Sequence, residues 1–108
     1  MARYLFIESR DAFDCADAPR LFELIAGVRE RRHDTTLFLV QNGVLAVREG
    51  ALPAERIAAL ARAGVHVLAD AFSLRERAID ATIEGVAPTD IDALVRLLLE
   101  PGTRAIWH

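Results

Sequence analysis

The stretch that decides the fold is Thr36–Gln41, which reads TLFLVQ. Its apolar residues follow one another without a polar residue between them, which is typical of a strand covered on both faces, as in a parallel sheet. Arg3–Glu8 (RYLFIE) and Val65–Ala69 (VHVLA) have a similar character, with aromatic or β-branched residues in short apolar runs. These three segments predict the buried centre of a parallel sheet.

Helix signals separate the three segments. Asp17 can cap a helix that has Pro19 in its first turn, and Pro53 opens a second helix that Gly64 ends. Apolar side chains recur with helical spacing in both helices: Leu21, Leu24, Ile25 and Val28 in the first, and Ile57, Leu60 and Ala61 in the second. The chain therefore alternates between strands and helices.

The rest of the chain continues this alternation after a turn signal at Asn42-Gly43. We expect a helical turn at Val44–Val47, a loop with a short helix at Asp70–Ala78, a strand at Thr82–Val86, a helix at Ile91–Glu100 and a strand at Arg104–Trp107. Thr89 and Asp92 predict a capping box for the last helix. The order predicts one α/β domain over residues 1–108, with about five mostly parallel strands and helices on both faces.

Composition narrows the class of protein. The net charge of −3 disfavours nucleic acid as a partner, and a single cysteine cannot form an internal disulfide, which is typical of a reducing compartment. No apolar run approaches the length of a membrane span, and the N-terminal run is too short for a secretion signal. We therefore expect a cytoplasmic protein without membrane contact. All 13 basic residues are arginine, which excludes mechanisms that need a lysine.

The loops that follow the strands are where we expect a site, because ligands of open parallel sheets bind beyond the carboxyl ends of the strands. That rule selects Ser9–Asp17, Gln41–Gly43, Asp70–Ser73 and Gly85–Pro88. A small ligand or an anion would contact the following residues there: Gln41, Asn42, Gly43, Asp70 and Arg77.

The sequence has no cofactor or metal signature. A G-x-G-x-x-G motif and a Walker A motif are both absent, so neither a dinucleotide nor a P-loop nucleotide is predicted. Glu8 and Asp70 could imitate the acidic residues of a phosphoacceptor receiver, but that site also needs a lysine. His33, His66 and His108 are scattered, without the spacing of zinc ligands. We therefore expect no metal and no cofactor.

Cys15 is the only thiol in the chain. It precedes a predicted helix N-terminus, which favours the thiolate form. Asp11, Asp14 and Asp17 surround it in the sequence, and their negative charges disfavour a thiolate. Both interpretations stay open: a functional nucleophile or an inert small residue.

Four segments, read in order, resemble a known family. They are Thr36–Val47 (TLFLVQNGVLAV), Val65–Ile79 (VHVLADAFSLRERAI), Ile83–Leu97 (IEGVAPTDIDALVRL) and Arg104–Trp107 (RAIW). Together they are similar to the DsrE/DsrF/DsrH family of sulfur-relay proteins, also called the TusBCD type, over nearly the whole chain. The QNG after the second strand and Trp107 resemble the DsrH/TusB branch in particular.

The resemblance implies a flavodoxin-like three-layer sandwich that forms trimers, hexamers or hetero-oligomers with related DsrE/DsrF-like subunits. Members of the family pass persulfide sulfur between cysteines. The sulfur-carrying cysteine follows the third long strand, where this chain has Asp70, and a second cysteine of some relatives corresponds to Ser73.

A carboxylate cannot replace the sulfur nucleophile. We therefore expect a non-catalytic or regulatory subunit rather than an enzyme. Two alternatives remain: sulfur transfer through Cys15, or a module that binds a small ligand or an anion at the strand-end loops.

Overall fold

The structure is a computed structural model, and it describes residues 2–108. Its elements, in chain order, are β1 (Arg3–Glu8), α1 (Ala18–Glu30), β2 (Asp34–Leu39), the 3₁₀ segment η1 (Gln41–Val47), α2 (Ala54–Arg62), β3 (His66–Asp70), α3 (Ala71–Glu76), β4 (Val86–Thr89), α4 (Ile91–Leu99) and β5 (Thr103–Trp107). The five strands form one sheet in the order β4-β3-β2-β1-β5, and every neighbouring pair is parallel.

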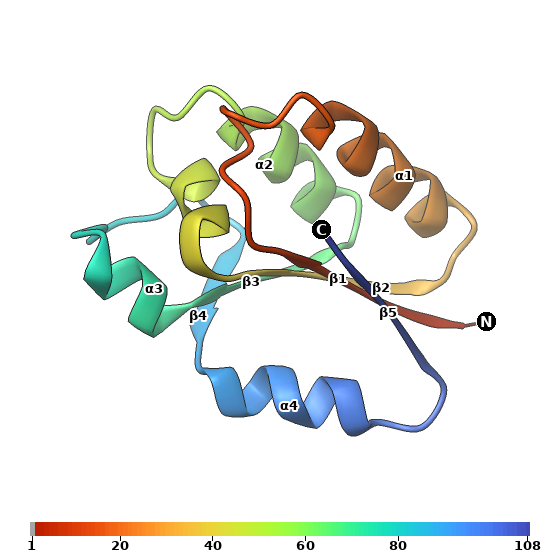
Figure 1. Cartoon of the computed structure of the whole chain (residues 1–108). Helices are drawn as coiled ribbons and strands as arrows, with labels where there is room; N and C mark the ends of the chain where they lie inside the picture. The colour runs from red at the N-terminus through yellow and green to blue at the C-terminus, as the bar shows by residue number, and fades with distance from the viewer. Residues whose placement is uncertain (1) are drawn as a thin grey trace.

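The path of the chain explains how the helices divide between the two faces of the sheet. From β1 to β4 the strands are added in one direction, so right-handed crossovers place α1 and α2 on the same face. The return from β4 to the far side of β1 runs through α4, which covers the opposite face (Figure 1). The predicted three-layer α/β class is therefore confirmed. The strand order differs from that of flavodoxin, in which β1 lies between β2 and β3.

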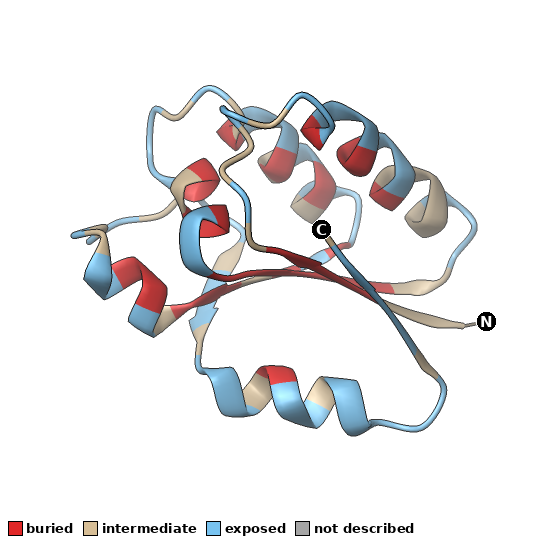
Figure 2. Ribbon diagram, in the orientation of Figure 1, coloured by how far each residue is buried: buried red, intermediate tan, exposed pale blue. Residues whose placement is uncertain are grey.

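The two faces of the sheet have unequal cores. The larger core lies under α1 and α2 and contains Phe6, Ile25, Leu37 and Ile57 among its fully buried members. The smaller core consists of Leu5, Ile7, Phe38, Val40 and Leu94. The central strands are accordingly buried on both faces, as Figure 2 shows for β1 and β2. The continuous apolar run of the second strand is explained by this double coverage.

Helix α4 carries more apolar surface than the sheet covers. Of its residues only Leu94 is buried. Its other large apolar side chains are exposed, except for the partly buried Leu97: Ile91, Val95, Leu98 and Leu99. The helix expected in this segment is present, but its apolar side chains are only partly packed against the sheet.

The fourth strand and the cap of α4 are not where the sequence analysis expected them. The strand is Val86–Thr89 and not Thr82–Val86, because Gly85 adopts a φ of +95° and the pairing with β3 starts at Val86. Thr82 forms an isolated antiparallel bridge with Arg48 instead. Thr89 therefore ends β4 and does not cap α4.

Two smaller corrections concern helix ends and faces. The carboxylate of Asp90 caps α4 by accepting a hydrogen bond from the backbone N–H of Ala93 at 3.0 Å. Asp17 is at the N-cap of α1, but its side chain makes no capping hydrogen bond. Leu24, expected on the buried face of α1, is exposed.

Candidate functional site

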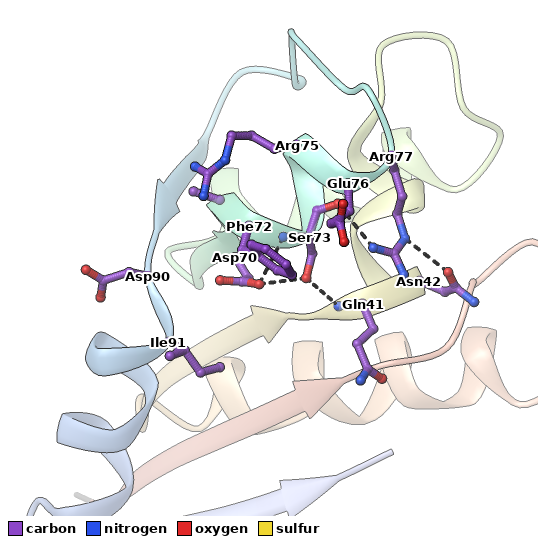
Figure 3. A pocket seen from close by; sticks show the side chains of 11 residues that line it. Gln41, Asn42, Asp70, Phe72, Ser73, Arg75, Glu76, Arg77, Asp90 and Ile91 are labelled. Carbon is purple, nitrogen blue, oxygen red and sulfur yellow. Dashed lines mark hydrogen bonds between the residues drawn. The ribbon is translucent and has the colours of Figure 1, made fainter.

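A cavity of about 1000 Å³ lies at the carboxyl ends of β2 and β3, between η1, α3 and the start of α4 (Figure 3). Among the sequence-predicted site residues, the following line it: Gln41, Asn42, Asp70, Ser73 and Arg77. Gly43 and Cys15 do not line it. Asp70 and Ser73 therefore lie at the carboxyl edge of the sheet, where the sequence analysis expected a site.

Asp70 and Ser73 form the buried centre of this cavity wall. Asp70 is 6% exposed and Ser73 is 3% exposed. The Asp70 carboxylate caps α3: its Oδ2 accepts hydrogen bonds from the Ser73 backbone N–H at 3.0 Å and from the Ser73 hydroxyl at 2.6 Å. The cap explains why α3 begins directly after β3, and it fixes the side chain of Asp70 against the end of the sheet.

The Ser73 hydroxyl also joins α3 to η1. Its oxygen accepts a hydrogen bond from the backbone N–H of Gln41 at 2.8 Å. Gln41 has a φ of +51°, a conformation that non-glycine residues rarely adopt. Two residues later, Gly43 approaches the carbonyl of Glu8 so closely that a Cβ there would overlap its oxygen. These contacts hold the loop after β2 in a single tight turn.

Arg77 forms a second connection between α3 and η1. Its Nε donates to the side-chain oxygen of Asn42 at 3.1 Å, and its Nη1 donates to the backbone carbonyl of Ser73 at 3.2 Å. The guanidinium is therefore engaged by neutral acceptors. Around it the cavity has further lining residues of mixed character: Phe72, Arg75, Glu76, Asp90 and Ile91.

Cys15 lies in a separate hollow of about 460 Å³ in the loop between β1 and α1. The thiol residue is partly buried and forms no disulfide. Asn42 lines both this hollow and the larger cavity, so the two share one wall. The structure thus places Cys15 at the same edge of the sheet as Asp70, but in different surroundings.

One polar cluster at this edge was missed by the sequence analysis. The side chain of Glu8 is 2% exposed, and its Oε2 lies 2.7 Å from Nδ1 of His108. Its Oε1 accepts the backbone N–H of Arg10 at 2.9 Å. The cluster lies between β1 and β5, where the strand order reverses. The only signal in the sequence was an acidic residue at the end of an apolar strand.

The remaining predicted positions are distributed as follows. Gly85 precedes β4, and Val86–Pro88 belong to the strand itself, so the loop expected at Gly85–Pro88 was wrong. Asp90 and Ile91 line the cavity instead. His33 accepts a hydrogen bond from the backbone of Ala2, and His66 is paired with Asp34 at 3.6 Å. Within residues 2–108, no group of three or more His, Cys, Asp or Glu side chains could hold a metal ion.

The helices of the described chain are too short and too polar for any of them to cross a bilayer. The fold and the site together define a class: a five-stranded parallel α/β domain with a polar cavity at the carboxyl ends of β2 and β3. A family model described as "DsrE/DsrF-like family" matches residues 3–107. The chain belongs to the DsrE/DsrF-like family.

Solved structures share this fold. The chain is similar to the ychN protein from E. coli, with a TM-score of 0.89 and 19% identity. It is also similar to MTH1491 from Methanobacterium thermoautotrophicum, a protein of unknown function, with a TM-score of 0.79 and 23% identity. Each comparison covers 100% of both chains. A search of curated proteins finds no significant match.

Proposed function

We propose that this protein is a non-catalytic subunit of a sulfur-relay assembly, similar to the DsrH/TusB branch of its family. The observation that carries the proposal is the group at the end of β3. The family resemblance implies a sulfur-carrying cysteine at that position in the catalytic relatives, whereas this chain has Asp70, which accepts two hydrogen bonds from Ser73. The proposed location is the cytoplasm.

The chemistry of persulfide transfer explains why this substitution matters. The carrier must attack a sulfur donor with a thiolate, and neither a carboxylate nor a hydroxyl forms a persulfide. The Ser73 hydroxyl is also fully occupied by internal hydrogen bonds, because it donates to Asp70 and accepts from the backbone N–H of Gln41. The groups at this site serve the local structure, which is compatible with a supporting role in an assembly.

The exposed apolar side of α4 supports assembly with another subunit. Ile91, Val95 and Leu98 are spaced so that they form one stripe along the helix, next to the exposed Leu99. Apolar patches of this kind commonly mark protein interfaces. The proposed partner is a cysteine-bearing DsrE/DsrF-like subunit, or further copies of this chain in a trimer or hexamer.

The proposal is tested by persulfide loading. The wild-type protein, Asp70→Cys and Cys15→Ala are incubated with a persulfide donor and measured by intact mass. We expect the mass of one added sulfur atom on Asp70→Cys only, because the substitution restores a thiol at the end of β3. Loading of the wild-type protein at Cys15 would contradict a non-catalytic role.

Assembly is tested by light scattering after size-exclusion chromatography, with the chain alone and mixed with a cysteine-bearing relative. We expect either a homo-oligomer or a complex with the relative. Val95→Asp should disrupt it, whereas Arg96→Asp, on the polar side of the same helix, should disrupt it much less. A strict monomer that binds no relative would contradict the proposal.

A second candidate is sulfur transfer through Cys15. The observation that favours it is the partly exposed thiol in a hollow that adjoins the main cavity at Asn42. In this case wild type gains one sulfur atom and Cys15→Ser gains none. The same mass experiment therefore separates the two candidates.

A further inference from the structure

Two carboxylates are buried among the described residues, Glu8 and Asp70, and only Glu8 has a basic side chain as its partner. Glu8 is paired with the ring of His108. Asp70 has no ion pair with any described residue, although it is 6% exposed. Buried carboxylates normally have a charged partner or hydrogen bonds to both oxygens, because the loss of hydration is costly.

The geometry of Asp70 indicates where its missing partner would lie. Both hydrogen bonds from Ser73 go to Oδ2. The other oxygen, Oδ1, makes no hydrogen bond to the described residues and points away from Ser73 in Figure 3. It is not sealed from solvent either, since Thr103 Oγ1 is the sole buried side-chain nitrogen or oxygen among residues 2–108 that has no hydrogen-bond partner. Because Asp70 lines the cavity of about 1000 Å³, Oδ1 is available to a ligand there.

We propose that this cavity binds an organic cation, a guanidinium or ammonium group with a short apolar body, through Asp70 Oδ1. A charge-assisted hydrogen bond to a carboxylate is about twice as strong as a neutral one. The ring of Phe72 is 60% exposed at the cavity wall and offers a face for the cation. Ile91 supplies apolar surface, and Asp90 adds a second carboxylate to the lining.

The other occupants fit less well. An anion would meet the buried negative charge of Asp70. A structural metal ion would need more ligands, and the described residues form no group of three or more metal-binding side chains. The arginines that line the cavity do not pair with Asp70. Arg77 donates hydrogen bonds to Asn42 and to the Ser73 carbonyl, and Arg75 forms no ion pair with Asp70.

The same chemistry could come from a free small molecule or from an arginine side chain of a protein partner. The experiment is titration of the isotope-labelled full chain, followed by its amide NMR spectrum. The probes are ethylguanidinium chloride for the free cation and an acetylated, amidated Gly-Arg-Gly peptide for the side chain. Sodium chloride at equal ionic strength is the control for screening.

We expect saturable shifts of the amide signals of residues 70–73 with one or both probes, and preference for the peptide would identify a side chain as the source. Asp70→Asn keeps an oxygen acceptor for Ser73 and removes the charge. It should weaken binding by about tenfold or more. Asp92→Asn, which removes an equal charge from the exposed side of α4 outside the cavity, should leave binding unchanged.

Phe72→Leu provides a second variant at an exposed position, so the test does not depend on the folding of Asp70→Asn. Loss of the aromatic face should weaken binding by about two- to fivefold. The proposal is wrong if neither probe shifts residues 70–73 beyond the sodium chloride control, or if Asp70→Asn and Asp92→Asn bind equally. The outcome is independent of the sulfur-relay proposal, which the persulfide experiment tests separately.

Discussion

Gly43 is the residue at which the backbone itself sets the shape of the site. The 3₁₀ segment η1 passes so near to β1 that a Cβ at Gly43 would overlap the carbonyl oxygen of Glu8. We expect Gly43→Ala to lower the free energy of unfolding by about 1–3 kcal/mol, because the loop must move away from the strand. Urea denaturation measures the change.

Gly27 is the matched control for this substitution. It lies in α1, and a Cβ there would have no atom within 4 Å. Gly27→Ala should therefore raise the stability by about 0.5–1 kcal/mol, because alanine loses less conformational freedom in a helix. Equal effects of the two substitutions would contradict the close approach at Gly43.

The pair of Glu8 and His108 is the other residue-scale feature with a measurable consequence. His108→Ala leaves Oε2 of a buried carboxylate without its partner at 2.7 Å, so we expect a loss of about 1–3 kcal/mol. His66→Ala is the control, because His66 is 68% exposed and its pair with Asp34 spans 3.6 Å. An exposed pair of this kind contributes about 0–1 kcal/mol. Thermal unfolding measures the stability of both variants. A loss of stability for His66→Ala that equals or exceeds that for His108→Ala would contradict the prediction.

Helix α4 is the element whose apolar side chains differ most in burial. Leu94 is buried against the sheet, whereas Leu99 is 77% exposed near the end of the same helix. In the monomer we expect Leu94→Ala to cost about 2–5 kcal/mol and Leu99→Ala less than about 0.5 kcal/mol. Chemical denaturation at low protein concentration measures both.

The same pair of variants also reports on assembly. If the exposed side of α4 is covered by another subunit, Leu99→Ala becomes destabilising as the protein concentration rises, because association then depends on this surface. A concentration-independent effect of Leu99→Ala would argue against this part of the helix as the interface.

At the scale of the whole molecule, the sheet is protected unevenly. β1 and β2 lie inside the sheet and are covered on both faces, whereas β4 is an edge strand without a buried residue. We expect the amides of Leu5–Ile7 and Leu37–Leu39 to exchange with solvent only by global unfolding. Those of Val86–Thr89 should exchange at least about tenfold faster through local opening. Native-state hydrogen exchange measures these rates, and equal protection of β4 would contradict a locally unstable edge.

The layered α/β architecture could be predicted from the sequence, because the patterns that mark its strands and helices are local. The apolar runs around Leu5, Leu37 and Val67 identify buried parallel strands without reference to any other part of the chain. Helical spacing identifies α1 and α2 in the same way. The position of Asp70 at the carboxyl end of the third strand could also be predicted, since the alternation of elements brings the carboxyl ends of parallel strands to one edge.

The tertiary structure alone decided the features that depend on distant residues. The pairing of Glu8 with His108 joins residues 100 positions apart, and nothing in the local pattern around either indicates the other. The register of β4 depends on its pairing with β3, which begins only after the turn at Gly85. Whether an oxygen of Asp70 faces Ser73 or the open cavity is likewise set by the meeting of β3, α3 and η1. Local spacing determines which residues form an element, but the contacts between elements determine what each side chain meets.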